Sequence, residues 1–248
     1  MSLPLTGAVA LVALAYAMVG HAGATGYIAV MSLAGMSPAA IRPTALLLNV
    51  LVAAIGTAQF ARAGHFRGRL FLPLAVASVP CALVGGAITL PTRLLEVLLG
   101  FVLVASAARL VWGGDAILAP PPAATAGRRD WLVRGLVGGG IGLLSGLTGV
   151  GGGVFLTPVL VTWRAAALPE IAAVTAPFIL VNSLAGLAGG VWAGRDAPAV
   201  DGRLVVAAGL GGLVGSWLGA FRLPIAALRL VLAGVLAFAG LRLVGRGL

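Results

Sequence analysis

Eight long apolar segments, separated by short polar stretches, constrain the fold of this chain more than any other feature. They lie at about 3–20, 38–61, 69–90, 93–112, 131–148, 168–193, 203–222 and 225–245. An α-helix needs about 20 mostly apolar residues to cross a bilayer. Two shorter apolar segments, at about 26–35 and 152–163, are typical of half-helices or re-entrant segments. We therefore predict an all-α, polytopic membrane helical bundle with about eight long spans and two short broken segments.

The composition excludes the main alternatives to a membrane protein. Hydrophobic residues make up 60% of the 248 residues and charged residues only 9%, whereas soluble domains carry about 25% charge. The apolar segments leave room only for short loops, so no soluble catalytic or nucleic-acid-binding domain fits. All 16 basic residues are arginines, and they stand singly or in small groups between apolar segments. We interpret the net charge of +10 as a signal for membrane orientation and expect no nucleic-acid partner.

The two halves of the chain resemble each other. With a shift of 133 residues, Asn49 falls on Asn182, and Ser78, Ala82 and Gly86 fall on Gly211, Gly215 and Gly219. Small residues four apart form a stripe that lets a second helix approach closely, and Gly138, Gly142 and Gly146 form another such stripe. We predict a first transmembrane repeat at 1–112, a polar Pro-rich linker at 113–130 and a second repeat at 131–248. Such duplication is characteristic of secondary transporters.

The arginines and the short segments favour two different topologies. If only the eight long segments cross and the N-terminus is inside, one large group of arginines lies on the cytoplasmic face, as the positive-inside rule requires. That group is Arg62, Arg67, Arg69, Arg128, Arg129, Arg195, Arg203, Arg242 and Arg246. If the short segments also cross, each half has five crossings and the repeats are inverted. The charge pattern gives a slight preference to the first arrangement.

A glycine-rich stretch at 145–153 is the most specific local signal. It reads Ser-Gly-Leu-Thr-Gly-Val-Gly-Gly-Gly and precedes a short apolar segment. Glycines this dense do not continue a stable helix, so we expect the backbone to break inside the membrane. The N–H groups that begin the next half-helix would be unpaired, and they favour an anion. Thr148, Gly149, Gly151 and Gly152 are therefore candidate substrate-binding residues. The alternative is a patch of glycines that serves tight helix packing.

A second candidate break lies in the first half. At a shift of 126 residues, Gly20, Gly23 and Gly26 align with Gly146, Gly149 and Gly152. Gly23, Thr25 and Gly26 are the corresponding candidates for substrate binding. His21 could contact an anion or relay a proton, because ring nitrogens within a membrane are usually functional. The alternative is a histidine at the membrane interface that bonds a carbonyl group.

Four more polar residues lie in or beside apolar segments. Asn49, Thr175 and Asn182 are candidates for substrate binding, because buried amides and hydroxyls are costly unless they are hydrogen-bonded. They could instead join one helix to another. Arg42 could pair with an anion or extend to the membrane interface, and the interface is slightly favoured.

The sequence does not suggest an enzyme, a cofactor or a metal site. Ser145 could act as a nucleophile only with a base within hydrogen-bond reach, and the histidines are limited to His21 and His65. Two His, four Met and Cys81 are too few soft or borderline ligands for a transition-metal transporter.

The sequence resembles the TauE/SafE sulfite-exporter family of membrane transport proteins. The resemblance rests on the stretches at 146–153, 157–160 and 172–175, and on the duplicated helices over nearly the whole chain. Two places depart from the family pattern: Gly23-Ala-Thr-Gly26 has no downstream proline, and Arg42-Pro43-Thr44 replaces small and hydroxyl residues. The resemblance implies transport of small sulfur-containing or organic anions, such as sulfite or a sulfonate like sulfoacetate.

Together these inferences indicate a multi-pass secondary transporter of the bacterial inner membrane. We expect the anion to bind near the midplane, between the two glycine-rich breaks. The expected partners are the anion and the lipid bilayer; a coupling proton or sodium ion and a homo-oligomer stay open. The alternatives are a channel-like or structural membrane protein and a carrier of a different small solute.

Overall fold

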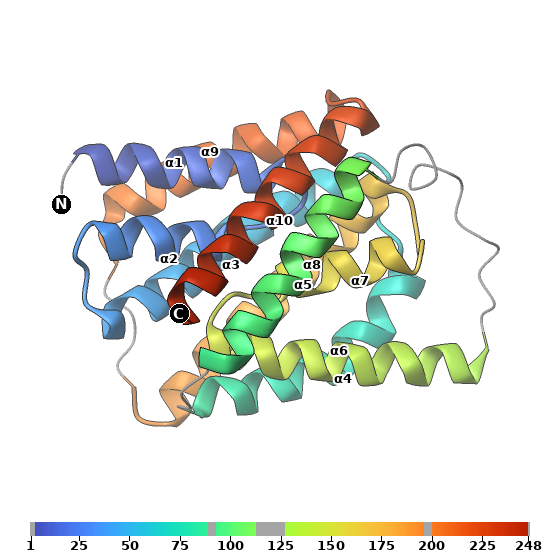
Figure 1. The fold of residues 1–248 in the computed structure, drawn as a ribbon, viewed down its shortest axis with the longest axis horizontal. Coiled ribbons are helices and arrows are strands. Elements are labelled where there is room, and N and C mark those ends of the chain that lie inside the picture. Colours follow the sequence, from blue (N-terminus) through green and yellow to red (C-terminus); the bar gives the residue numbers. More distant parts are fainter. Residues whose placement is uncertain (1–2, 89–92, 113–126, 196–199, 248) are drawn as a thin grey trace.

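The computed structural model describes residues 3–88, 93–112, 127–195 and 200–247, and these residues form ten helices (Figure 1). The helices are α1 (Leu3–Ala17), α2 (Ala24–Leu33), α3 (Pro38–Arg62), α4 (Gly68–Ala87), α5 (Arg93–Trp112), α6 (Arg128–Thr148), α7 (Gly153–Thr162), α8 (Leu168–Trp192), α9 (Gly202–Phe221) and α10 (Ile225–Gly247). Each apolar segment of the sequence is one helix. The all-helical membrane bundle is therefore confirmed.

Six helices of the described part are long and apolar enough to cross a membrane: α3, α4, α6, α8, α9 and α10. Residues 113–126 of the expected linker lie outside the described residues, and α6 already begins at Arg128 within its expected range. The boundaries of the two repeats stay a prediction.

The helices pack in pairs that join the two halves of the chain. The closest pairs are α4 with α6, α5 with α10 and α1 with α9. In Figure 1 the α1–α9 and α4–α6 pairs lie on opposite sides of the bundle, and α5 and α10 run diagonally across it. The first helix of each half thus packs on the fourth helix of the other half. The long helices α3 and α8 pack on each other between these pairs.

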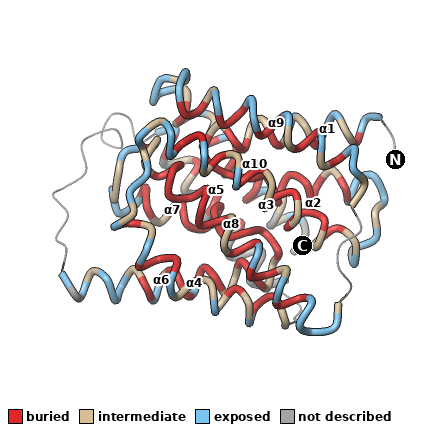
Figure 2. The backbone as a smooth tube through the Cα atoms, turned by 180° about the vertical axis from the view of Figure 1, so that it is seen from behind, coloured by how far each residue is buried: buried red, intermediate tan, exposed pale blue. Residues whose placement is uncertain are grey.

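The short helices α2 and α7 occupy the interior. Most of their residues are buried (Figure 2). Each has 10 residues and is about 15 Å long at 1.5 Å per residue, half of what a bilayer requires. In Figure 1, α2 runs back along α1, and α7 runs back along α6. The chain therefore forms two hairpins, each made of a longer helix, a glycine-containing break and a half-length helix.

The two hairpins enter the bundle from opposite ends. In Figure 1, α1 begins at the left end and α6 at the right end, so the two halves run in opposite directions. The α3–α4 connection lies at the right end and the α8–α9 connection at the left. The grouping of Arg62 with Arg195 and Arg203 on one face is therefore wrong. The structure has the inverted arrangement, in which corresponding helices of the two halves run in opposite directions through the bundle.

The stripes of small residues mark the closest helix contacts, as expected. A Cβ atom on Gly138, Gly142 or Gly146 of α6 would overlap with a backbone carbonyl oxygen of α4. A Cβ atom on Gly211, Gly215 or Gly219 of α9 would overlap with a carbonyl oxygen of α1. The absence of side chains is what lets the backbones of these helices touch.

Candidate functional site

The chain breaks between α6 and α7, where the glycine-rich stretch predicts it. Gly149 caps α6 with φ 74°, and its N–H group donates to the carbonyl oxygen of Ser145. Gly151 and Gly152 follow, each with φ 82°. This left-handed backbone is accessible to glycine at little cost and strained for other residues. Because α7 begins at Gly153, its first N–H groups have no acceptor within the helix.

Helices α3 and α8 bring polar side chains against this break. Asn49 Nδ2 lies 3.3 Å from the carbonyl oxygen of Val150 and donates to it. A Cβ atom on Gly151 would lie 2.6 Å from Asn49 Nδ2 and 2.9 Å from Ser183 Oγ. A Cβ atom on Gly152 would lie 3.3 Å from Ser145 Oγ. The break therefore runs directly past three polar side chains, one from each of α3, α6 and α8.

These three side chains carry polar atoms that lack a partner. Asn49 Oδ1, Ser145 Oγ and Ser183 Oγ are buried and make no hydrogen bond within the described part of the chain. All three residues have 0% exposure. Buried polar groups are normally bonded, so such a group points to a water, an ion or a ligand that completes it. Asn49 was expected here, whereas Ser183 was missed, although it directly follows Asn182 in an apolar segment.

Two arginines approach the same region from one end of the bundle. The Arg42 guanidinium donates to the carbonyl oxygen of Gly146 in the last turn of α6. A Cβ atom on Gly149 would lie 2.5 Å from Arg42 Cγ. The Arg195 Nη2 donates to the carbonyl oxygens of Gly86 at 2.6 Å and Ala87 at 3.0 Å, at the end of α4. Arg42 therefore lies beside the break, where its positive charge stabilises the carbonyl end of α6.

Polar groups around the first break form a hydrogen-bonded chain. His21 Nδ1 lies 3.1 Å from the carbonyl oxygen of Val19 and donates to it, because a carbonyl only accepts. In the neutral ring Nε2 then accepts from Thr157 Oγ1, 3.3 Å away. Thr157 in turn accepts from Thr175 Oγ1 at 3.2 Å. The structure thus places His21 and Thr175 together against the first turn of α7, in the interior of the bundle.

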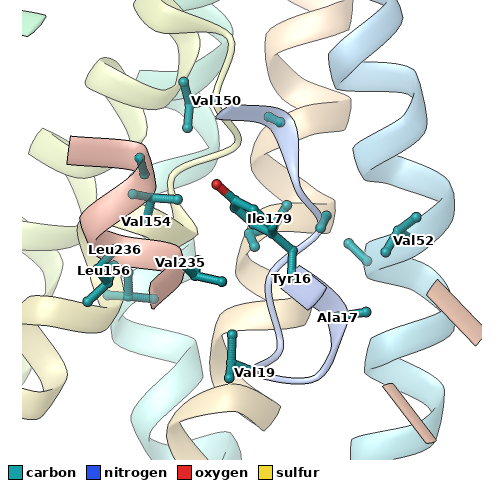
Figure 3. Packing of buried hydrophobic residues seen from close by; sticks show 14 of the residues in the cluster. Tyr16, Ala17, Val19, Val52, Val150, Val154, Leu156, Ile179, Val235 and Leu236 are labelled. Carbon is teal, nitrogen blue, oxygen red and sulfur yellow. The ribbon is translucent and has the colours of Figure 1, made fainter. Parts of the chain in front are cut away.

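The other residues of the first break are engaged in packing or local bonds. The Thr25 hydroxyl lies 2.7 Å from the Tyr16 hydroxyl and bonds with it. A Cβ atom on Gly23 would lie 3.0 Å from the Tyr27 ring, and one on Gly26 would lie 2.5 Å from Val12. The ring of Tyr16 points from the end of α1 into an apolar cluster that also contains Val150, Val154 and Ile179 (Figure 3). Gly23 and Gly26 therefore lie against closely packed side chains, and the buried Tyr27 hydroxyl beside Gly23 makes no hydrogen bond within the described residues.

Asn182 and Thr148 are also fully engaged. Asn182 Nδ2 donates to the carbonyl oxygen of Phe178 at 2.8 Å, and its Oδ1 accepts from the Ser78 hydroxyl. Thr148 donates to the carbonyl oxygen of Leu144 at 2.7 Å, within its own helix. Asn182 thus joins α8 to α4, the alternative interpretation of these amides.

The register of the halves explains why the two asparagines differ. Helices α3 and α8 begin 130 residues apart. The same shift of 130 relates Gly56 to Gly186 and Leu46 to Ala176, and the contact of Gly56 with Ala176 is thus equivalent to that of Gly186 with Leu46. Asn49 and Asn182, 133 residues apart, are therefore nearly one helical turn out of register. At the breaks the left-handed glycines pair as Gly20 with Gly149 and Gly23 with Gly152, a spacing of 129. The alignment of these glycines at 126 is wrong by one turn.

The start of α7 is therefore the place where the predicted residues meet. On one side are His21, Thr157 and Thr175, which bond to one another and, through His21, to the carbonyl oxygen of Val19. On the other side are Asn49, Ser145 and Ser183 with unpaired atoms, and Arg42 beside them. Within the described residues, no three His, Cys, Asp or Glu side chains lie close enough together to hold a metal ion.

Comparison with known proteins finds a matching family and a related protein. A model of the family described as "Sulfite exporter TauE/SafE" matches residues 5–243. The chain is 41% identical over 235 residues to a protein of Sinorhizobium fredii (strain NBRC 101917 / NGR234) described as "Probable membrane transporter protein y4hK", and the match covers 94% of each chain. No solved structure matches the chain.

Proposed function

The chain belongs to the TauE/SafE sulfite exporter family of membrane transporters, and on that premise we propose that it is a secondary carrier of a small sulfur-containing or organic anion. Sulfite and sulfonates such as sulfoacetate are the substrates that we test first. The anion binds at the start of α7, between the α6–α7 break and helices α3 and α8.

The unpaired polar atoms at this break are the observation that carries the proposal. The Ser145 and Ser183 hydroxyls can each donate to an oxyanion, and the first N–H groups of α7 add further donors. The positive end of the α7 dipole and the half-buried guanidinium of Arg42 favour negative charge at the same place. The site thus offers mainly donors, which suit an anion better than a cation.

The burial of the site supports a carrier over an open channel. Asn49, Ser145 and Ser183 are fully buried, and His21, Thr157 and Thr175 are at most 2% exposed. A channel requires a continuous polar pore, whereas a carrier holds its site closed toward at least one side. A site closed in this way has to open during each transport cycle.

The test compares the two asparagines in the purified full chain. Sulfite, sulfoacetate, sulfate, phosphate and acetate are added at constant ionic strength, and thermal stabilisation and proteoliposome flux are measured. A ligand that binds only the folded state must raise its stability. We expect one sulfur anion to stabilise the protein. Asn49→Ala should weaken its binding about tenfold, because the Asn49 amide N–H donates to the Val150 carbonyl oxygen and holds the break in its shape.

Asn182→Ala is the matched control. Since Asn182 joins α8 to α4, its loss should lower the free energy of unfolding by about 0.6–2 kcal/mol. The affinity for the anion should stay within about twofold of that of the parent protein. Equal loss of anion affinity in both variants contradicts the site at the second break. Stabilisation by no anion, together with no anion flux, contradicts the proposed function itself.

A further inference from the structure

A groove on the outer surface of the bundle has a composition that the transport site does not explain. It lies between α3 and α9, and its volume is about 690 Å³. Its lining is Ile55, Ala58, Gln59, Arg62, Leu213, Val214, Trp217 and Phe221. The four α9 residues in that lining are between 42% and 50% exposed. Within the groove Gln59 Nε2 donates to the carbonyl oxygen of Leu213 at 3.0 Å, which satisfies the amide N–H and leaves an apolar wall.

Two guanidinium groups lie where this groove reaches the end of the bundle. Arg62 ends α3 and lines the groove. Arg222 caps α9, and its guanidinium carbon lies 5.0 Å from the centre of the Trp217 ring, which also lines the groove. Neither arginine pairs with a carboxylate among the residues that the structure describes. The end of the groove is therefore cationic, and Trp217 is the aromatic type that gathers at the lipid headgroup level.

We propose that this groove binds one anionic glycerophospholipid, such as phosphatidylglycerol. An acyl chain lies along the apolar wall of α9, and the phosphodiester group lies between Arg62 and Arg222. Basic pockets between membrane helices are known to hold anionic headgroups. The site involves neither break and does not depend on the proposed transport function.

A second groove on the same helix provides a control. It lies between α1 and the other end of α9, has a volume of about 760 Å³ and is also mostly apolar. Its arginine is Arg203. Asp201 caps the N-terminus of the same helix, two residues before Arg203, and its carboxylate accepts from the backbone N–H group of Arg203 at 2.9 Å. A carboxylate therefore offsets the positive charge at this groove.

The experiment is native mass spectrometry of the full chain with equal amounts of phosphatidylglycerol and phosphatidylcholine that carry the same acyl chains. We expect the parent protein to retain phosphatidylglycerol preferentially. Arg62→Gln and Arg222→Gln should each lower that preference about fivefold, as expected for one arginine near an anionic headgroup. Arg203→Gln should leave it within about twofold, and Arg62→Lys should restore most of it.

Each remaining outcome overturns the proposal. An unchanged preference in the Arg62→Gln/Arg222→Gln double variant shows that the headgroup binds elsewhere, and an equal loss in Arg203→Gln shows a general effect of charge. If soluble glycerol phosphate displaces the lipid, the groove binds the phosphate group and the acyl chain does not contribute. A lipid-free dimer that Trp217→Ala converts to monomer shows that the groove is covered by a second copy of the chain. The thermal unfolding midpoint of every variant, measured with phosphatidylcholine alone, reports whether it is folded.

Discussion

Thr157 connects helices α7 and α8 and the first break through one hydroxyl group. It donates to His21 of the first break and accepts from Thr175 of α8, while its own helix is α7. Its side chain is 2% exposed, so water does not replace a lost partner. The position of α7, and with it the shape of the α6–α7 break, depends on this hydroxyl.

Replacing Thr157 by valine keeps the shape of the side chain and removes the hydroxyl. His21 Nε2 then lacks its donor in the interior, so we expect the free energy of unfolding to fall by about 1–3 kcal/mol. The measurement is thermal unfolding in detergent. Thr57→Val is the control, because Thr57 bonds only the carbonyl oxygen of Ala53 in its own helix, at 2.7 Å. A loss as large at Thr57 would show that the effect does not depend on the His21 bond.

At this scale the sequence predicts which polar residues matter but not what each one bonds. Asn49 and Asn182 lie in similar apolar segments, yet the partner of Asn182 is Ser78, 104 residues away. Only the packing of α8 on α4 brings these two together. Ser183 was missed for the same reason, since its position beside Gly151 depends on how α8 approaches the break.

At the scale of helices, the contact of α4 with α6 depends on glycines that allow backbone contact. Gly142 faces the carbonyl oxygen of Ser78, and a Cβ atom there would overlap with it. Gly140, on the same helix, has no atom within 4 Å of its Cβ position. Gly142 therefore lies in the contact between α4 and α6, whereas Gly140 of the same helix lies outside it.

This difference predicts opposite effects of one substitution. Gly142→Ala forces α4 and α6 apart and should lower the free energy of unfolding by about 1–3 kcal/mol. Gly140→Ala should leave stability unchanged or raise it by about 0.5–1 kcal/mol through helix propensity. Thermal unfolding of both variants checks this. Similar destabilisation of the two would mean that α4 and α6 do not touch along this stripe.

The helices themselves could be predicted closely because hydropathy alone determines where a membrane helix begins and ends. The stripes on α6 and α9 also predicted close contacts, but not their partners α4 and α1. The register of the breaks was wrong by three residues, because a shift of 126 aligns three pairs of glycines and a shift of 129 aligns only two. The backbone angles of Gly20, Gly23, Gly149 and Gly152 decide between these alignments.

For the whole molecule, the inverted arrangement makes a prediction about accessibility. Ser37 precedes α3 and Ala167 precedes α8, at opposite ends of the bundle. In a Cys81→Ala background, Ser37→Cys and Ala167→Cys should react with a membrane-impermeant maleimide from opposite sides. A parallel arrangement would expose both cysteines on one side, so labelling of both in intact cells contradicts the inverted fold.

The arginines add the direction of insertion. One end of the bundle carries Arg62, Arg67, Arg69, Arg129, Arg164 and Arg222, and the other carries fewer, namely Arg42, Arg195, Arg203 and Arg242. By the positive-inside rule the first end is cytoplasmic, so Ser37→Cys should be the variant labelled in intact cells. The sequence could not give this result, because its arginines divide between the ends only once the half-length helices are placed.

The pairing of α1 with α9 has a consequence for how the protein is made. The stripe on α9 that receives α1 is translated only after helices α2 to α8, so α1 enters the bilayer long before its neighbour exists. Contacts this distant in sequence form slowly and leave intermediates exposed. A nascent chain that stops before Gly219 therefore lacks part of the surface against which α1 rests. Synthesis of α10, and not completion of the first half, is the earliest point at which membrane quality control would find a partner for every helix.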